Sequence, residues 1–217
     1  MTYVTLAKLK VWIYWPLAIP ALIVYLLLPG SRKSKLSMDI QRFYTQYRGI
    51  TKKPEICKFY WLMCGVREFR NVFYMRCGYS CLLFKFFMPE MTQLNFAMPN
   101  SCIGGGVFIQ HGYTTVVDAA SIGENCWLNQ NVTIGHRGDG HPTIGKNVRI
   151  GSGAVVLGRI NIGDNVNIGA NAIVIQDVPS NSTICSPKAQ VVKTSTEPSA
   201  NALLAARAYH KPIEEIL

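Results

Sequence analysis

Three histidines in the middle of the chain are the residues best suited to chemistry near neutral pH. His111 stands alone, whereas His136 and His141 stand five positions apart in the stretch TIGHRGDGHPTIG, residues 133–145. A neutral imidazole can take a proton from a hydroxyl group, and it can also ligate zinc. The sequence therefore offers two kinds of chemistry: transfer of a group to a hydroxyl, and activation of water by a metal.

The elements that must position these histidines form a six-residue repeat that starts at residue 103. An aliphatic residue opens each hexad, glycine often follows it, and a small or β-branched residue is usual at the fifth place, as in IGKNVR (144), IGSGAV (150) and IGDNVN (162). Three hexads make one triangular coil of a parallel β-helix, with aliphatic side chains inside and small residues at the corners. One extra residue before Val116 and four in TIGHRGDGHPTIG interrupt the count.

The repeat region resembles the left-handed parallel β-helix (hexapeptide-repeat) acyltransferases. GGGVFIQHGYTTVV (104–117) is similar to the segment around the catalytic histidine of serine acetyltransferases, and residues 141–183 and SPKAQVV (186–192) are similar to their distal coils and closing strand. The resemblance implies a mostly β fold, a homotrimer with active sites shared between subunits, and acetyl-CoA in the groove between adjacent β-helices. It also implies that His111 is the general base, which deprotonates an acceptor hydroxyl as that hydroxyl attacks the thioester.

Further residues are expected to complete this site. Asp118 is the candidate for orienting His111, and the acceptor-side wall comprises His136, Arg137, Asp139 and His141, with His141 favoured over His136. A pantetheine arm can lie close to the chain only where side chains are small. The residues expected to contact acetyl-CoA are therefore Gly135, Gly151, Gly153, Ala154, Gly169 and Ala170, with Lys188 and Lys193 as phosphate contacts.

Departures from the serine acetyltransferase pattern bear on the acceptor. Those enzymes carry aspartates where this chain has Gln110 and Phe96. They also carry the sequence Asp-Arg-His-Pro, in which this chain has Gly140 in place of the arginine. A free amino acid normally needs opposite charges for its ammonium and carboxylate groups. In this respect the chain looks more like the sugar and polysaccharide O-acetyltransferases of the same branch, whose acceptors are uncharged hydroxyls. That resemblance implies a sugar hydroxyl of a capsular, exopolysaccharide or other surface-glycan precursor, either free or lipid-linked.

Three further functions stay open. The first is a serine O-acetyltransferase. The second is a metalloenzyme like the γ-class carbonic anhydrases, which share this fold and bind zinc through histidines that include a pair spaced like His136 and His141. His111 lies one coil of eighteen residues plus seven before His136, a poor register for a third ligand, so no metal is expected. The third is a non-enzymatic trimeric scaffold.

The first half of the chain carries all the excess positive charge. Residues 1–100 hold 14 Lys and Arg against 4 Asp and Glu, whereas residues 101–217 hold 8 against 8. Residues 11–29 are free of charge, are flanked by basic residues, and would span about 28 Å as one helix. We expect this charge to meet anionic lipid rather than nucleic acid.

Four segments follow from these patterns: an apolar membrane-associated segment (1–35), a helical region (36–94), the β-helix (95–193), and a tail with a short helix (194–217). Pro16 and Pro20 leave open whether residues 11–29 cross the membrane, re-enter it or lie on it, and the same run could also be a cleaved signal peptide or a buried helix. Residues 58–90 suit either helices on a membrane surface or a helical pair that packs within the domain. Membrane contact through residues 1–90 would place the enzyme on the cytoplasmic face of the inner membrane, where acetyl-CoA is available.

Overall fold

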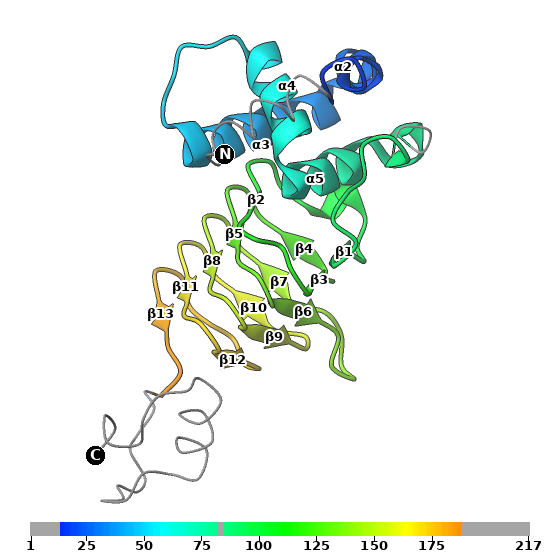
Figure 1. Cartoon of the computed structure of the whole chain (residues 1–217). Coiled ribbons are helices and arrows are strands. Elements are labelled where there is room, and N and C mark those ends of the chain that lie inside the picture. Colours follow the sequence, from blue (N-terminus) through cyan, green and yellow to red (C-terminus); the bar gives the residue numbers. More distant parts are fainter. Residues whose placement is uncertain (1–13, 82–84, 188–217) are drawn as a thin grey trace, which may run out of the picture. The chain divides into compact units, whose positions relative to one another are not determined.

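The computed structural model describes residues 14–81 and 85–187, and the first compact unit extends to Ser186. Its N-terminal part is helical, and its C-terminal part is a stack of parallel β coils (Figure 1). The helices are α2 (Ala18–Leu27), α3 (Gly30–Arg48), α4 (Glu55–Gly65) and α5 (Arg67–Cys77), followed by the short 3-10 helices η1 (Gly78–Cys81) and η2 (Asn100–Cys102). The expected boundary at residues 35–36 therefore falls inside α3.

The strands form three parallel sheets, which are the three faces of a triangular coil. Face A holds β1 (Leu94–Phe96), β3 (Thr115–Val117), β6 (Thr133–Gly135), β9 (Val155–Leu157) and β12 (Ile173–Val174). Face B holds β4 (Ser121–Ile122), β7 (Thr143–Ile144) and β10 (Asn161–Ile162). Face C holds β2 (Phe108–Ile109), β5 (Trp127–Leu128), β8 (Arg149–Ile150), β11 (Asn167–Ile168) and β13 (Thr183–Ile184). The chain visits faces C, A and B in turn, so the prediction of a mostly β, parallel β-helix is confirmed.

The aliphatic residues that open the hexads build the interior. On face B, Ile122 pairs with Ile144, which pairs with Ile162, and all three are buried. Residues 188–193, the end of the predicted β-helix, lie outside the described part of the chain.

Three edges separate the faces, and each edge repeats from coil to coil. The A–B edge consists of residues 118–120, 136–142 and 158–160, and the C–A edge consists of residues 110–114, 129–132, 151–154 and 169–172. On the B–C edge, asparagines 125, 147, 165 and 181 all have positive φ, the conformation that a tight corner needs and that Asn tolerates. The four-residue interruption thus lengthens the A–B edge, and the one-residue interruption lengthens the C–A edge.

Helices α4 and α5 pack within the domain. Phe59, Leu62, Phe69 and Phe73 are completely buried, and the ring centroids of Phe59 and Phe73 lie 5.4 Å apart. Burial also raises the pKa of the Cys64 thiol to about 11, which fits the expectation of cysteines as small apolar residues. Of the two structures expected for residues 58–90, the helical pair is therefore the one observed.

The basic side chains of this region are used inside the protein. Lys58 donates to Gln41 Oε1 (2.7 Å), and Arg70 donates to the carbonyl of Pro89 (2.8 Å). Arg76 is completely buried and pairs with Asp39, whose side chain is equally buried, across 2.8 Å. Lys58, Arg70 and Arg76 therefore serve the packed helices, because each of them has an internal partner.

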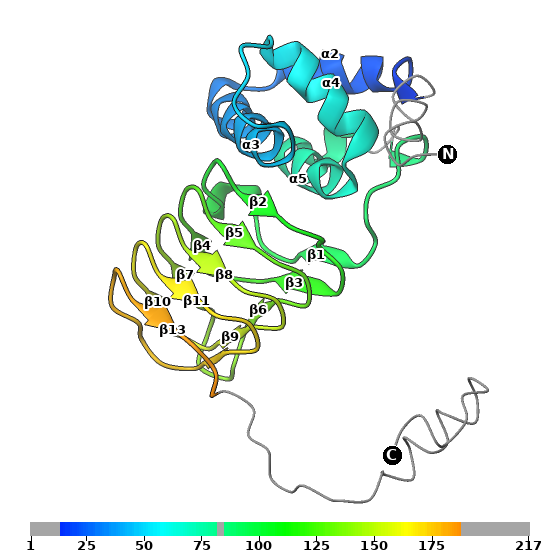
Figure 2. The ribbon, with the colours of Figure 1, turned by 60° about the vertical axis from the view of Figure 1, so that its left-hand side comes forward.

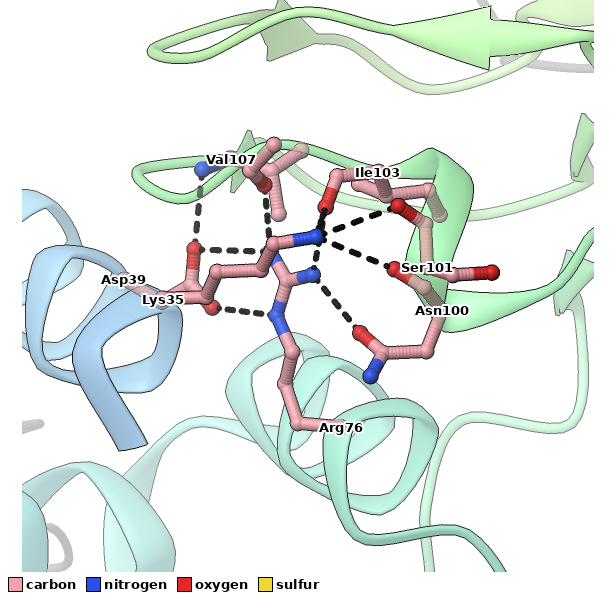
Figure 3. A network of polar contacts seen from close by, with 8 residues as sticks. Lys35, Asp39, Arg76, Asn100, Ser101, Ile103 and Val107 are labelled. Atoms are coloured by element: carbon pink, nitrogen blue, oxygen red, sulfur yellow. Dashed lines mark hydrogen bonds and ion pairs between the residues drawn. The ribbon is translucent and has the colours of Figure 1, made fainter. Parts of the chain in front are cut away.

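Arg76 joins the helices to the first coil (Figure 3). Its guanidinium donates to the carbonyl oxygen of Ile103 (2.9 Å) and to Asn100 Oδ1 (2.8 Å), and Lys35 Nζ donates to the same Ile103 carbonyl (2.8 Å). Asp39 Oδ1 accepts the backbone N–H of Val107 (2.9 Å). Helix α3 also contacts β2 and α5 contacts β1, so the helices cover the first coil (Figure 2).

The apolar run of residues 11–29 does not form one long helix within the described residues. Helix α2 has only ten residues and ends at Leu27. Pro29, which lies just before α3, cannot continue α2, because proline has no backbone N–H to donate. Among residues 14–81 and 85–187, no helix combines the length and the apolar character needed to span a membrane. One face of α2 is exposed and apolar, with Ile19, Ile23 and Leu27 40–78 % accessible. Membrane association and the cytoplasmic-face location stay predictions.

We predict that Arg76→Met lowers the free energy of unfolding by about 3–5 kcal/mol, because it leaves a buried carboxylate unpaired and backbone carbonyls without donors. Chemical denaturation measures this loss. Lys85→Met is the matched control, since its ion pair with Glu90 (2.8 Å) is about one-third exposed and should contribute under about 1 kcal/mol. Equal losses in the two variants would contradict the role given to Arg76.

Candidate active site

His111 lies in the lengthened first corner of the C–A edge. Residues 110–114 form this corner, which is one residue longer than the corners 129–132, 151–154 and 169–172 of the following coils. His111 has φ +62° and an exposed side chain. A histidine held in the left-handed region costs about 1 kcal/mol or more, and such strain is concentrated at functional sites. The corner thus presents an imidazole at the surface through an extra residue and a strained backbone conformation, neither of which the β-helix fold requires.

Most of the residues expected to contact acetyl-CoA lie on the same edge as His111. Gly151 and Gly153 belong to one corner, and Gly169 and Ala170 belong to the next. An added Cβ at Gly151 would lie 2.6 Å from the backbone nitrogen of Ala170, so this glycine is needed for close stacking of the coils. These corners therefore expose backbone and very small side chains along the edge that begins at His111.

The other expected acetyl-CoA contacts have a different outcome. Ala154 is completely buried, so its side chain faces the interior and cannot line an external groove. Gly135 ends β6 and lies next to the A–B edge, away from the other candidates. Lys188 and Lys193 lie outside the described residues.

The loop of residues 136–142 projects from the A–B edge, between Asp118 in the coil before it and Arg159 in the coil after it. Because Ser121, Thr143 and Asn161 pair in register, His141 is level with Arg159. Asp118 Oδ1 lies 3.8 Å from His141 Nδ1, and the His136 and His141 ring centroids are 5.2 Å apart. Asp118 and His111 lie on opposite edges of face A, so Asp118 cannot orient the His111 of its own chain, and a role toward the His111 of a neighbouring subunit stays a prediction.

A pocket of about 420 Å³ opens beside this loop. It is lined by Ala97, Met98, Pro99, Cys102, Asp118, Ala119, Ala120, Gly140, His141 and Arg159. Of the residues expected at the site, Asp118 and His141 line this pocket, whereas His136, Arg137 and Asp139 do not. Asp139 holds the loop to the following coil instead, since its Oδ1 accepts the backbone N–H of Arg159 (3.3 Å).

The charged groups of the pocket are only partly shielded from water. The His141 and Asp118 side chains are 35 % and 31 % accessible, and their 3.8 Å separation is too long for a hydrogen bond. His141 Nδ1 is itself buried and has no hydrogen-bond partner among the described residues.

Sequence reasoning missed Arg159. It stands in the hexad VLGRIN as an ordinary corner residue, and only the coil length relates it to the loop, because it lies eighteen residues after His141.

The structure does not assemble the ligands of a zinc metalloenzyme within one chain. Among residues 14–81 and 85–187, no group of three His, Cys, Asp or Glu side chains is placed to hold a metal ion. His111, which such a site would need beside His136 and His141, lies on the other edge of face A.

Comparisons with known proteins agree with this fold. Residues 141–176 match the family model "Bacterial transferase hexapeptide (six repeats)". The native serine acetyltransferase 1 of Entamoeba histolytica is 32 % identical in sequence, with a TM-score of 0.56 over 78 % of this chain and 68 % of that chain. The chain belongs to the hexapeptide-repeat transferases. The predictions of the left-handed β-helix acyltransferase family and of a transferase enzyme are confirmed at that level.

Other similar proteins carry the same name. A Neisseria gonorrhoeae serine acetyltransferase solved in complex with serine gives a TM-score of 0.57 at 25 % identity, over 75 % of this chain and 70 % of that chain. Curated serine acetyltransferases from Synechococcus elongatus and Staphylococcus aureus are 42 % and 47 % identical over 45 % and 44 % of this hexapeptide-repeat protein. The matches cover 42 % and 47 % of those two relatives, so the chain spans under half of their length.

These relatives correct one prediction. A sugar hydroxyl of a surface-glycan precursor as acceptor is wrong, because the similar proteins named above are serine acetyltransferases. The prediction rested on missing charges at positions 96, 110 and 140. The structure supplies a carboxylate and a guanidinium to the pocket from Asp118 and Arg159 instead.

We predict that His111→Asn raises the free energy of unfolding by about 0.5–1 kcal/mol, because Asn tolerates the left-handed conformation better than His does. Thermal or chemical denaturation measures the change. His136→Asn is the matched control, since His136 is exposed and is not among the residues with positive φ. An unchanged or lower stability of His111→Asn would show that the corner is not strained.

Proposed function

We propose that this chain is an acetyl-CoA-dependent serine O-acetyltransferase that works as a homotrimer. The observation that carries the proposal is the division of the candidate residues between two edges of one face. His111 and the small-residue corners occupy the C–A edge, whereas the pocket with Asp118 and His141 occupies the A–B edge. The names of the similar proteins support acetyl transfer to serine as the reaction.

A cyclic trimer explains why the site is divided. In a closed ring, every subunit presents one patch to one neighbour and a different patch to the other neighbour. Such a ring can bring the C–A edge of one copy against the A–B edge of the next copy. His111 of one subunit then faces the pocket of its neighbour, and acetyl-CoA lies along the groove between the two.

In the proposed reaction, His111 takes the proton of the serine hydroxyl as its oxygen attacks the thioester carbonyl. The carbon–sulfur bond then breaks, and the departing coenzyme A thiolate receives a proton from the imidazolium. The products are O-acetylserine and free coenzyme A, with no covalent enzyme intermediate. The pocket around His141 holds the serine, and the imidazole of that histidine can form a hydrogen bond with it.

Serine turnover is the first test. We predict that the chain acetylates L-serine with acetyl-CoA and that His111→Ala lowers kcat by about 10²–10⁴-fold, because it removes the general base. Release of the coenzyme A thiol measures the rate. Lys146→Ala is the control, since its ion pair with Glu124 (3.7 Å) lies on the exposed B–C edge.

Two results contradict the proposal in different ways. Acetyl-CoA binding without any turnover of serine would show that serine is not the acceptor. No binding of acetyl-CoA in calorimetry would favour the non-enzymatic scaffold.

Mixing two inactive variants tests the shared site. His111→Ala subunits retain an intact A–B edge, and His141→Ala subunits retain an intact C–A edge. After unfolding and refolding together in equal amounts, about one interface in four should pair the two intact edges, so activity should return to about a quarter of the wild-type value. The same variants refolded separately provide the baseline, and no recovery on mixing would place the whole site within one subunit.

A further inference from the structure

The pocket on the A–B edge holds two groups of opposite charge that lack a charged partner within hydrogen-bonding distance among the described residues. Arg159 lines the pocket, and its guanidinium makes no hydrogen bond or ion pair with any described residue. Asp118 has His141 as its nearest charged neighbour, at 3.8 Å, and no ion pair joins Asp118 to Arg159. A pocket that holds an unpaired guanidinium, together with a carboxylate that has only a histidine beside it, complements a zwitterion such as a free amino acid.

Gly140 explains why the guanidinium comes from Arg159. Gly140 has φ +140°, a conformation that residues with side chains rarely adopt. A Cβ added there would lie 3.4 Å from Arg159 Cβ and 3.7 Å from Arg159 Nε. The stem of Arg159 therefore lies in van der Waals contact with the place where a side chain at position 140 would begin. The serine acetyltransferase pattern has its arginine at that position.

The loop and the Arg159 corner are also fixed to each other. Asp139 Oδ1 accepts the backbone N–H of Arg159, and it lies 3.2 Å from where a Cβ at Gly158 would be. Arg137, the nearest other guanidinium in the loop, is exposed and does not line the pocket. Of the two arginines, only Arg159 is placed to reach a molecule that lies beside Asp118 and His141.

We propose that Arg159 binds the α-carboxylate of the acceptor and so selects a free amino acid. The proposal rests on the proposed function, because it concerns the acceptor of that same reaction. A guanidinium binds a carboxylate through two parallel hydrogen bonds, and a neutral carboxamide cannot replace that ion pair. Arg159 thereby does the work that the sequence pattern assigns to the arginine missing at position 140.

The test compares L-serine with L-serinamide, which has the same hydroxyl and ammonium groups but no carboxylate. For Arg159→Ala, we expect kcat/KM with L-serine to fall about 10–100-fold, chiefly through KM, and kcat/KM with L-serinamide to change less than about threefold. Arg159→Lys keeps the positive charge but cannot form the bidentate hydrogen bonds, so it should recover part of the lost kcat/KM with L-serine. Arg159 is exposed, so thermal unfolding should match that of the wild type.

The outcomes separate this proposal from the proposed function. If the wild type acetylates serine and Arg159→Ala keeps its preference for serine over serinamide, Arg159 is not the carboxylate-binding residue, while the proposed function stands. Loss of that preference in Arg137→Ala instead would assign the role to Arg137. If the wild type acetylates neither compound, the proposed function is wrong, and calorimetry decides the role of Arg159. Equal affinity of the wild type for L-serine and L-serinamide would then overturn the proposal that Arg159 binds the carboxylate.

Discussion

The buried Arg76–Asp39 pair solves the problem of the open end of a solenoid. Within the stack, the carbonyl oxygens of Ile122, Ile144 and Ile162 each accept an N–H from a glycine of the preceding coil. Ile103 occupies the same place in the first coil, so no preceding coil can supply its donor. Arg76 and Lys35 take the place of that coil, and Asp39 compensates the charge of Arg76. A buried polar group left without a partner costs about 1–3 kcal/mol, so the first coil depends on these helices.

Each coil keeps its register through parallel pairing with its neighbours. Parallel pairing places the residues of each edge above one another at intervals of about eighteen, and it tolerates extra residues only where the chain turns. Both interruptions of the repeat lie at such turns, so they alter the surface without changing the interior. This arrangement explains how a regular prism can hold an exposed, strained His111 on one edge and a seven-residue loop on another.

The hexads predicted the fold well because the interior repeats with the same period as the sequence. Ile122, Ile144 and Ile162 could be assigned to the core from their spacing alone. The role of Arg76 could not, because its partner Asp39 is far away in the chain and a basic residue among aromatic ones also suits a lipid surface. The acceptor was predicted wrongly for a related reason. The pattern shows that an arginine is missing at position 140, but only the stacking of coils shows that Arg159 reaches the same pocket.

The link between the loop and the coil below it sets a limit on how this surface can be redesigned or can diverge. Asp139 and Gly140 both contact the Arg159 corner, through a hydrogen bond and through close packing. A loop grafted from a protein with a larger residue at position 140 would place that residue against the Arg159 stem in a backbone conformation that side chains rarely allow. A corner exchanged alone would leave Asp139 facing a different backbone. The smallest exchangeable module is therefore the loop together with the next turn of the same edge. Two sequence segments that look independent should then change together among related chains.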